Sequence, residues 1–328
     1  MSQIKERSKL LELENVKQQY KVGFGIGNTK TAVCLSDISF TIDEGQTLGL
    51  VGESGSGKTT TTRAVLGIEP PASGNIRYRG KPLSEFDKKD WKGFRKEVQA
   101  VFQNPLDSFD PRFKVQRLLE EPLLINKKGS RQDRKGRTAE LLELVGLSAD
   151  FLNRYPHEFS GGQLQRIAIA RALALDPKLL VLDEPVSALD VSVRGQILNL
   201  LHDLQKEKNI SYLYISHDIA SVRYLCDKIA IIYFGQIVEY GSTEQIFNNP
   251  LHPYTRELLR AGVVTELSDD VEGIVHEVPS VTAPPPGCPF ADRCPYCIEN
   301  CRAKVPSAYT EAEEGHFALC IKDNGDGS

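Results

Sequence analysis

Short runs of apolar residues alternate with longer amphipathic segments along most of this chain. Short, largely apolar runs predict strands at residues 47–51, 98–102, 178–183 and 211–216. Apolar positions at helical spacing predict helices at residues 58–66 and 193–206 and a mostly helical block at 112–175. Within that block, two apolar stripes are formed by Leu118, Leu119 and Leu123 and by Leu141, Leu142 and Val145. Buried strands that alternate with helices predict an α/β fold, with the block inserted between two strands.

The two ends of the chain follow other patterns. Residues 10–39 alternate like strands around a glycine-bearing loop, and residues 229–233 and 237–240 flank Gly235 like a hairpin. A proline-rich stretch at 278–286 predicts an extended linker. The short cysteine-rich segment after it offers little core, so we expect it to need a metal for stable folding.

Composition and charge exclude several classes of protein. The chain has 328 residues, and its 40 Lys and Arg against 44 Asp and Glu give a formal net charge of −4. This balance provides no global basic field for binding nucleic acid. No run approaches the ~20 apolar residues that span a bilayer, and residues 1–9 lack the apolar core of a secretory signal. We therefore expect a cytoplasmic protein that acts at a membrane only through a partner.

A glycine-rich loop follows the predicted strand at 47–51. The sequence Gly52-Glu53-Ser54-Gly55-Ser56-Gly57-Lys58-Thr59 matches the pattern G-x-x-x-x-G-K-[ST], and it lies between a strand and a helix as that pattern requires. The backbone N–H groups of such a loop, together with the N-terminus of the next helix, surround phosphate oxygens. Lys58 is expected to neutralise the β- and γ-phosphates, and the Thr59 hydroxyl to bind Mg²⁺.

Two carboxylates end a later apolar run. Asp183 and Glu184 follow Leu179–Leu182 directly. At the carboxyl end of a strand, Asp183 is expected to reach the Mg²⁺ shell, and Glu184 to act as a general base on water. In a chain without a phosphate loop, the same pair would fit the N-cap of the next helix equally well.

A second anion site is predicted before another helix. Ser160, Gly161, Gly162 and Gln163 open a long amphipathic helix, whose serine N-cap, N–H groups and dipole favour an anion. This site serves either a second ligand of the same chain or the nucleotide of a second subunit.

These three motifs resemble, in kind and order, those of the ATP-binding cassette ATPases. Gln103 resembles the glutamine loop of that family, Ser187–Asp190 its D-loop and His217 its switch histidine. Taken alone, each has a simpler interpretation: a solvated Gln103, a His217 satisfied beside Asp218, and an Asp190 that caps the next helix. Six motifs in this order make the resemblance very specific.

The resemblance implies an ATP-binding cassette P-loop core at residues 10–249, with a helical subdomain at about 112–175 and a cysteine-rich C-terminal extension at 250–328. It implies a catalytic set of Glu184, His217 and Gln103. It implies nucleotide contacts from Gly52, Ser54, Gly55, Ser56, Gly57, Lys58, Thr59, Thr60, Tyr20, Asp183, Ser160, Gly161, Gly162, Gln163 and Asp190. It implies Mg²⁺ ligation by Thr59, Gln103 and Asp183. Tyr20 is the candidate for stacking on adenine, and Phe24 competes with it.

The C-terminal region indicates which group of ATP-binding cassette ATPases the chain resembles. Pro250–Thr255 and Gly287–Pro295 resemble the extension of oligopeptide and dipeptide importer ATPases, which nickel importers share. Cys288, Cys294, Cys301 and Cys320 have spacings x5, x6 and x18, similar to the family members that hold a [4Fe–4S] cluster on four thiolates. Cys297 is additional. Its pairing with Cys294 as C-x-x-C could instead suit zinc, and a third interpretation leaves all the thiols free.

The resemblance also implies a mechanism and partners. ATP would lie between the phosphate loop of one subunit and Ser160–Gln163 of the other in a head-to-tail dimer, which closes on binding and reopens on hydrolysis. The second ATP-binding cassette subunit is expected to be a related but different chain. The cycle would drive import, most often of di- or oligopeptides delivered by an extracellular solute-binding protein, through two separate permease subunits. The protein would lie at the cytoplasmic face of the membrane, with Gln103 and the helical block facing the permeases.

Other functions fit less of the sequence. Soluble ATP-binding cassette proteins that act on nucleic acid or ribosomes commonly carry two cassettes or a long basic insertion, and neither is seen here. A degenerate subunit that cannot hydrolyse ATP is disfavoured because Lys58, Asp183, Glu184 and His217 are all present. Nickel or sugars in place of peptides stay open, because no residue of this chain touches the cargo.

Overall fold

The computed structural model describes residues 8–23, 30–264, 280, 282–306 and 308–320. The chain forms two compact units. One, here the helical unit, contains Ser8 and residues 42–47 and 85–216. The other, here the phosphate-loop unit, contains the described residues within 9–41, 48–84 and 217–320. Phe24 of the sequence analysis lies outside the described residues.

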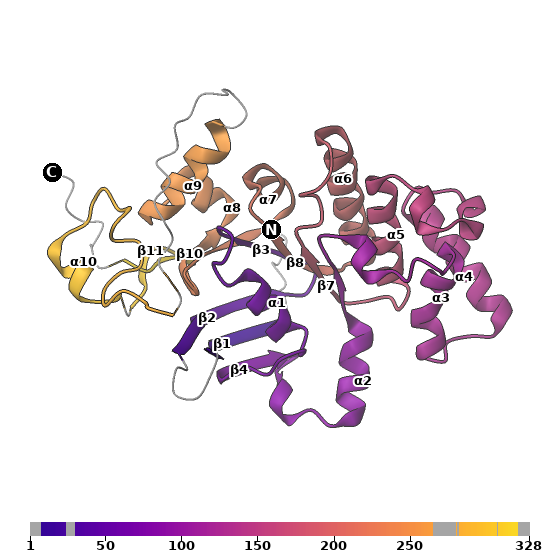
Figure 1. The fold of residues 1–328 in the computed structure, drawn as a ribbon, viewed down its shortest axis with the longest axis horizontal. Coiled ribbons are helices and arrows are strands. Elements are labelled where there is room, and N and C mark those ends of the chain that lie inside the picture. Colours follow the sequence, from indigo (N-terminus) through magenta and orange to yellow (C-terminus); the bar gives the residue numbers. More distant parts are fainter. Residues whose placement is uncertain (1–7, 24–29, 265–279, 281, 307, 321–328) are drawn as a thin grey trace, which may run out of the picture. The chain divides into compact units, whose positions relative to one another are not determined.

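The helical unit contains a parallel run of strands in the order β8-β7-β6. Val98 pairs with Leu179 across β6 and β7, and Asp183 pairs with Ile215 across β7 and β8. Its main elements are α2 (Lys88–Glu97), β6 (Val98–Val101), α3 (Val115–Ile125), α4 (Arg131–Leu144), α5 (Gly161–Leu173), β7 (Leu179–Asp183), α6 (Val191–Lys208) and β8 (Ser211–Ser216). Helices α3, α4 and α5 pack side by side (Figure 1).

The phosphate-loop unit carries a mixed sheet in the order β5-β4-β1-β2-β10-β9-β3, and its last hairpin, β11–β12, pairs with β10. Its strands are β1 (Lys9–Val22), β2 (Lys30–Asp43, its end in the other unit), β3 (Thr47–Val51), β4 (Ser73–Tyr78), β5 (Lys81–Pro82), β9 (Lys228–Tyr233), β10 (Gln236–Ser242), β11 (Thr310–Glu313) and β12 (His316–Ala318). Its helices are α1 (Lys58–Val65), α7 (Ile219–Leu225), α8 (Thr243–Asn248), α9 (Pro253–Val264) and α10 (Glu299–Ala303).

Most elements expected from the hydrophobic pattern are confirmed. The four apolar runs form strands, and both predicted leucine stripes are buried. The hairpin at Gly235 is confirmed as well: Tyr233 pairs with Gln236, and the two residues between them, Phe234 and Gly235, have φ values of 46° and 75°. Two positive φ angles are the signature of the tight turn that matches the twist of paired strands.

Helix α2 was not predicted from the sequence. Its sequence, KKDWKGFRKE, is mostly charged, and only Phe94 is buried. The helix forms because Asp87 caps it, accepting hydrogen bonds from the N–H groups of Lys89 and Asp90, and because Trp91 and Phe94 pack edge-to-face 5.5 Å apart. No helix in the described part of the chain has the length and apolar character needed to cross a membrane.

Candidate nucleotide site

The phosphate loop forms a closed turn between β3 and α1. Lys58 is buried, and its Nζ donates hydrogen bonds to the carbonyls of Gly52 (2.6 Å) and Glu53 (2.8 Å). The Ser56 N–H donates to the Glu53 carbonyl at 3.2 Å, and the Ser56 carbonyl accepts from Gly235 at 2.8 Å. The ammonium group therefore lies against the loop, where phosphate oxygens could replace the two carbonyls as its partners.

Helix α1 begins directly after the loop. Its N-cap, Gly57, has a φ of 111°, and a Cβ there would come within 2.9 Å of the Cys34 carbonyl, so both the backbone conformation and the space require glycine. No side chain caps the helix. The first-turn N–H groups, which have no carbonyl partner within a helix, therefore form the anion site that the motif predicts. Thr59 is exposed and Thr60 half-exposed, while Ser56 is buried.

Tyr20 and His217 belong to the same unit as the loop. Tyr20, on β1, is half-exposed, and its hydroxyl donates to Glu69 at 2.6 Å, which ties the ring to a fixed position. Burial, followed by this hydrogen bond, raises the pKa of Tyr20. His217 is exposed and lies between β8 and α7, where its neighbour Asp218 caps α7 by accepting from the Ala220 N–H at 3.1 Å.

The two predicted carboxylates lie at the end of β7 in the helical unit. Both are half-buried. Glu184 has a φ of 48°, a left-handed conformation that costs roughly 1–2 kcal/mol for a residue with a side chain. The conformation is held because the Glu184 N–H donates to Ile215 at 2.9 Å and its carbonyl accepts from Ser187 Oγ at 3.0 Å. Such local strain is found most often at functional sites.

The serine-glycine-glycine-glutamine segment caps α5. Ser160 Oγ accepts from the Gln163 N–H at 3.4 Å, and Gln163 Oε1 accepts from the Ser160 N–H at 3.1 Å, a reciprocal capping box. Ser160 and Gly161 are exposed, so this helix end is open to a ligand. Gly162 is buried, and a Cβ there would come within 2.3 Å of Val193 on α6. The second glycine is thus required by helix packing.

Gln103 and Asp190 are both exposed in the helical unit. Gln103 follows β6. Asp190 occupies the N-cap position of α6, but its side chain makes no capping hydrogen bond there. Capping therefore does not account for the carboxylate of Asp190.

Comparison with known proteins agrees with these motifs. Residues 35–187 match the ABC transporter family, and residues 238–301 match the oligopeptide/dipeptide transporter C-terminal region. The chain is 46% identical over 325 residues to the dipeptide transport ATP-binding protein DppF of Haemophilus influenzae, with 98% of both chains covered. It is 42% identical to the oligopeptide transport ATP-binding protein AppF of Bacillus subtilis, with 95% of this chain and 96% of AppF covered. The chain belongs to the oligopeptide/dipeptide ABC transporter ATP-binding subunits.

A solved structure supports the same fold. The ATP-binding cassette MJ0796, determined as a dimer in a post-hydrolysis state bound to ADP and Pi, matches 71% of this chain and 99% of its own, with a TM-score of 0.64 and 29% identity. The transporter subunit is thus an ATP-hydrolysing enzyme of the ATP-binding cassette fold, for which ATP and Mg²⁺ are the expected cofactors.

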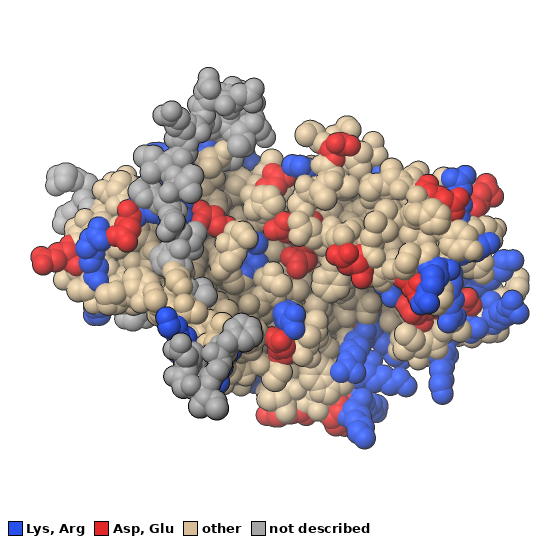
Figure 2. Space-filling model, viewed as in Figure 1, with Lys and Arg blue, Asp and Glu red and all other residues tan. Residues whose placement is uncertain are grey.

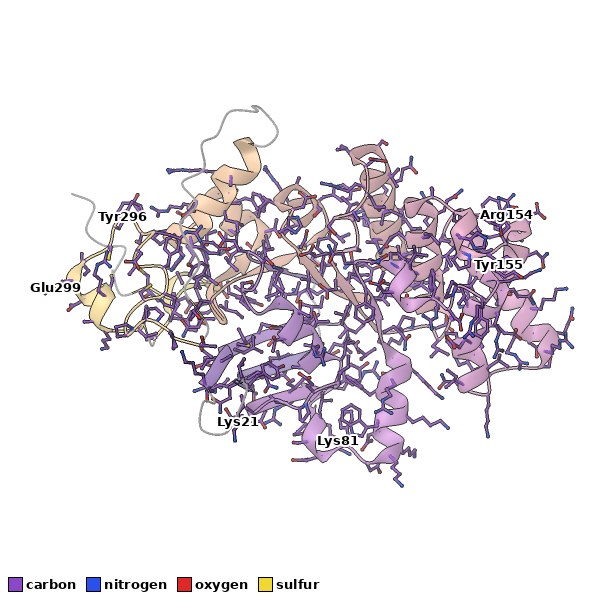
Figure 3. All side chains as sticks on the ribbon, viewed as in Figure 1. Lys21, Lys81, Arg154, Tyr155, Tyr296 and Glu299 are labelled. Atoms are coloured by element: carbon purple, nitrogen blue, oxygen red, sulfur yellow. The ribbon has the colours of Figure 1, made fainter. Side chains whose placement is uncertain are left out.

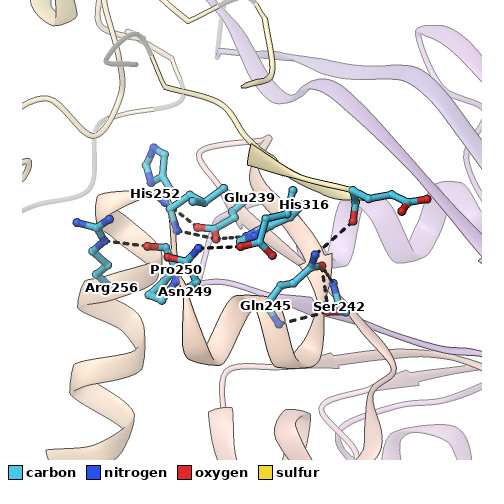
Figure 4. Close-up of polar contacts among 11 residues, drawn as sticks. Glu239, Ser242, Gln245, Asn249, Pro250, His252, Arg256 and His316 are labelled. Atoms are coloured by element: carbon cyan, nitrogen blue, oxygen red, sulfur yellow. Dashed lines mark hydrogen bonds and ion pairs between the residues drawn. The ribbon is translucent and has the colours of Figure 1, made fainter. Parts of the chain in front are cut away.

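The C-terminal region of the transporter subunit joins its sheet through a buried carboxylate. Glu239 on β10 is fully buried, and its oxygens accept from the N–H groups of Leu251 (2.9 Å) and His252 (2.8 Å) and contact His316 Nε2 at 2.9 Å (Figure 4). Burial lowers the pKa of His252 to about 4, partly offset by the charge of Glu239. The Glu239 carboxylate therefore connects β10 to the start of α9 and to β12.

The cysteines of the transporter subunit lie together without forming a single-ion site. Charges on Cys301, Cys320 and Cys294 contribute to raising the pKa of Cys288, which burial chiefly raises to about 11. The Cys288 N–H donates to the Cys301 carbonyl at 2.7 Å. Among the described residues, however, no three His, Cys, Asp or Glu side chains are arranged to hold a metal ion. The geometry of the described residues therefore shows no metal-binding group.

Sequence reasoning missed one residue beside the phosphate loop. Arg293, from the cysteine segment, forms an ion pair with Glu53 inside the loop at 2.7 Å. Arg293 lies within Gly287–Pro295, a segment whose sequence indicates the family resemblance and no role for this residue. No local pattern indicates a partner 240 positions away.

Proposed function

We propose that this subunit powers the import of di- or oligopeptides, with MgATP bound at Gly52–Thr60 and hydrolysed with Glu184 as the base. In this proposal Thr59, Gln103 and Asp183 hold Mg²⁺, His217 lies near the γ-phosphate, Tyr20 stacks on adenine, and Ser160–Gln163 with Asp190 complete the site of a second cassette subunit. The core would cover residues 10–249, with a helical subdomain at about 112–175 and the C-terminal extension at 250–328. The relatives, named for dipeptide and oligopeptide transport, support the cargo.

A groove in the helical unit is the observation that carries the transport part of the proposal. It has a volume of about 530 Å³ and lies among α2, α3 and α5. Exposed apolar Phe102 and Ile125 line it together with the basic side chains Lys88, Lys92 and Arg95. Phe102 directly precedes Gln103, and basic side chains gather over α2 (Figure 2). An apolar groove with a basic rim suits a short helix of a permease that ends in acidic groups.

The partners follow from this proposal. The subunit would lie as a peripheral protein at the cytoplasmic face of the membrane. There its groove would bind a helix of one of two permease subunits. A second ATP-binding cassette subunit, expected to be a related chain, would complete each nucleotide site. An extracellular solute-binding protein would deliver the peptide.

Ile125→Asp tests the transport proposal. Ile125 is 73% exposed, so the change should leave folding and the ATPase activity of the isolated subunit intact. A carboxylate in the groove would repel the acidic end of the permease helix and compete with it for the basic rim, so permease association and peptide uptake should fall by about tenfold or more. The control is Ile68→Asp, an isoleucine outside the groove that is 55% exposed. Uptake of peptide, nickel and a sugar is measured in vesicles carrying the whole transporter. Normal peptide uptake by the Ile125 variant, or uptake of only nickel or sugar, would reject the proposal.

We also propose that Cys288, Cys294, Cys301 and Cys320 hold a [4Fe–4S] cluster. In such a cluster each thiolate binds a different iron, so the four sulfurs need not converge on one ion as zinc requires. The spacings x5, x6 and x18, similar to those of family members that carry such a cluster, support this grouping. Because burial raises the pKa of Cys288 and Cys294, loading must displace protons from these thiols.

Metal analysis of anaerobically purified protein tests the cluster. We expect a brown protein with about four irons per chain. Cys288→Ser or Cys301→Ser should lose the iron, whereas Cys297→Ser and Cys34→Ser, which lie outside the four-ligand pattern, should keep it. Stoichiometric zinc without iron would replace the cluster with a zinc site, and no metal would leave the thiols free.

A further inference from the structure

Glu53, the first variable residue of the phosphate loop, is held at all three of its polar groups. Its N–H donates to the Tyr254 hydroxyl at 3.0 Å, and its carbonyl accepts from Lys58 Nζ at 2.8 Å. Its carboxylate accepts two hydrogen bonds from Arg293, at 2.9 Å from Nη1 and 2.7 Å from Nη2. Tyr254 and Arg293 come from the C-terminal region. The position of the loop therefore depends on residues outside the nucleotide motifs.

The Arg293 side chain is mostly buried and surrounded by aromatic rings. It is only 11% exposed, and its guanidinium carbon lies 5.4–5.8 Å from the ring centroids of Tyr233, Tyr254 and Phe290. Its Nη2 also donates to Glu257 on α9 at 2.6 Å. A planar guanidinium can pair with a carboxylate at two points while stacking among aromatic rings, which a lysine ammonium cannot do.

The charge of Glu53 explains why this contact matters for nucleotide binding. The loop must receive a triphosphate, and an unpaired carboxylate within it would repel that ligand. Glu53 is 34% exposed and Arg293 is the cation that pairs with its carboxylate through both oxygens.

We propose that Arg293 is a positioning residue for the nucleotide: it neutralises Glu53 and fixes the phosphate loop in the form that accepts the phosphates. The proposal rests on the assignment of this loop to ATP. It also connects the cysteine segment to the loop, because Arg293 immediately precedes Cys294 and Phe290 packs among the same rings as Arg293. Order in the cysteine segment is then a condition for tight nucleotide binding.

A double-mutant cycle tests the proposal. Arg293→Ala leaves Glu53 charged beside the phosphates, so MgADP affinity should fall and the KM for MgATP rise by about tenfold, with kcat little changed. Glu53→Gln combined with Arg293→Ala removes the repelling charge and should recover most of the lost affinity. Arg293→Lys should recover little, because lysine lacks the two-point geometry. The matched control is Arg302→Ala, since Arg302 pairs with Asp292 at the surface of the same segment.

Three outcomes would bear on the role of Arg293 or on the assignment of the loop to ATP. A double variant that binds no better than Arg293→Ala, or effects of the two changes that simply multiply, would overturn the proposal. A fall in kcat with unchanged KM would overturn it as well. Lys58→Ala tests the underlying assignment separately: if it leaves MgADP affinity unchanged, the loop is not the nucleotide site, and the assignment fails rather than the role of Arg293. Melting temperatures of all variants show whether any loss reflects unfolding.

Discussion

Glu184→Gln should reduce ATP turnover by about a hundredfold or more while MgATP binding persists. The amide keeps the length and hydrogen-bonding capacity of the side chain but cannot take a proton from the attacking water. Glutamine can also keep the backbone hydrogen bonds that hold position 184 between Ile215 and Ser187. ATP should therefore stay bound, and a closed dimer should accumulate. ATPase assays and size-exclusion chromatography with and without MgATP measure the two effects.

A second glutamate of the same unit provides the control for this result. Glu143 is exposed on α4, and Glu143→Gln should leave both turnover and dimer formation unchanged. Hydrolysis at the normal rate by Glu184→Gln would remove Glu184 from the role of general base. Loss of MgATP binding by that variant would instead mean that the substitution had disturbed the site itself.

The nucleotide motifs could be predicted from the sequence because each is local. A strand, a glycine loop and the start of a helix lie within residues 47–65, so spacing alone determines the arrangement of Lys58 relative to the loop carbonyls. The capping box between Ser160 and Gln163 is likewise set by residues three apart. The strands could also be predicted locally, because short apolar runs of four to eight residues bounded by turn signals are consistent with buried strands.

Contacts between distant parts of the chain could not be predicted in this way. Glu239 lies in a predicted strand, where alternation would place a charged residue on the solvent side, yet it is fully buried because the C-terminal region covers that face (Figure 4). Every nucleotide motif precedes residue 250, so the sequence indicates no contact between the extension and those motifs. The cysteine segment also contacts α9. The guanidinium carbon of Arg256 on α9 lies 5.9 Å from the centroid of the Tyr296 ring, which Figure 3 labels. Substitutions in the cysteine segment are therefore expected to reach the phosphate loop through Arg293, rather than to leave hydrolysis largely untouched.

If this chain can homodimerise, a mixture of two inactive variants should recover ATPase activity when the Ser160 segment acts on the nucleotide of the partner subunit. Ser160→Arg places a long cation at the exposed start of α5, and Lys58→Ala removes the ammonium from the phosphate loop. Each homodimer then has two broken sites. A mixed dimer concentrates both defects in one site and leaves the other intact. Random pairing of equal amounts should return roughly a quarter of the wild-type activity.

The control for this mixture is one chain that carries both substitutions. Every dimer of that chain has two broken sites, so no activity should return at any concentration. Ser160→Arg also removes a helix cap worth about 1 kcal/mol, and its melting temperature therefore has to be compared with that of the wild type. If mixed dimers form, as judged by co-purification of two differently tagged chains, but remain inactive, Ser160 does not act in trans. In a head-to-tail dimer, each nucleotide site contains the phosphate loop of one subunit and the Ser160 segment of the other. We therefore expect activity to return when the two variants are mixed and not to return in the doubly substituted chain.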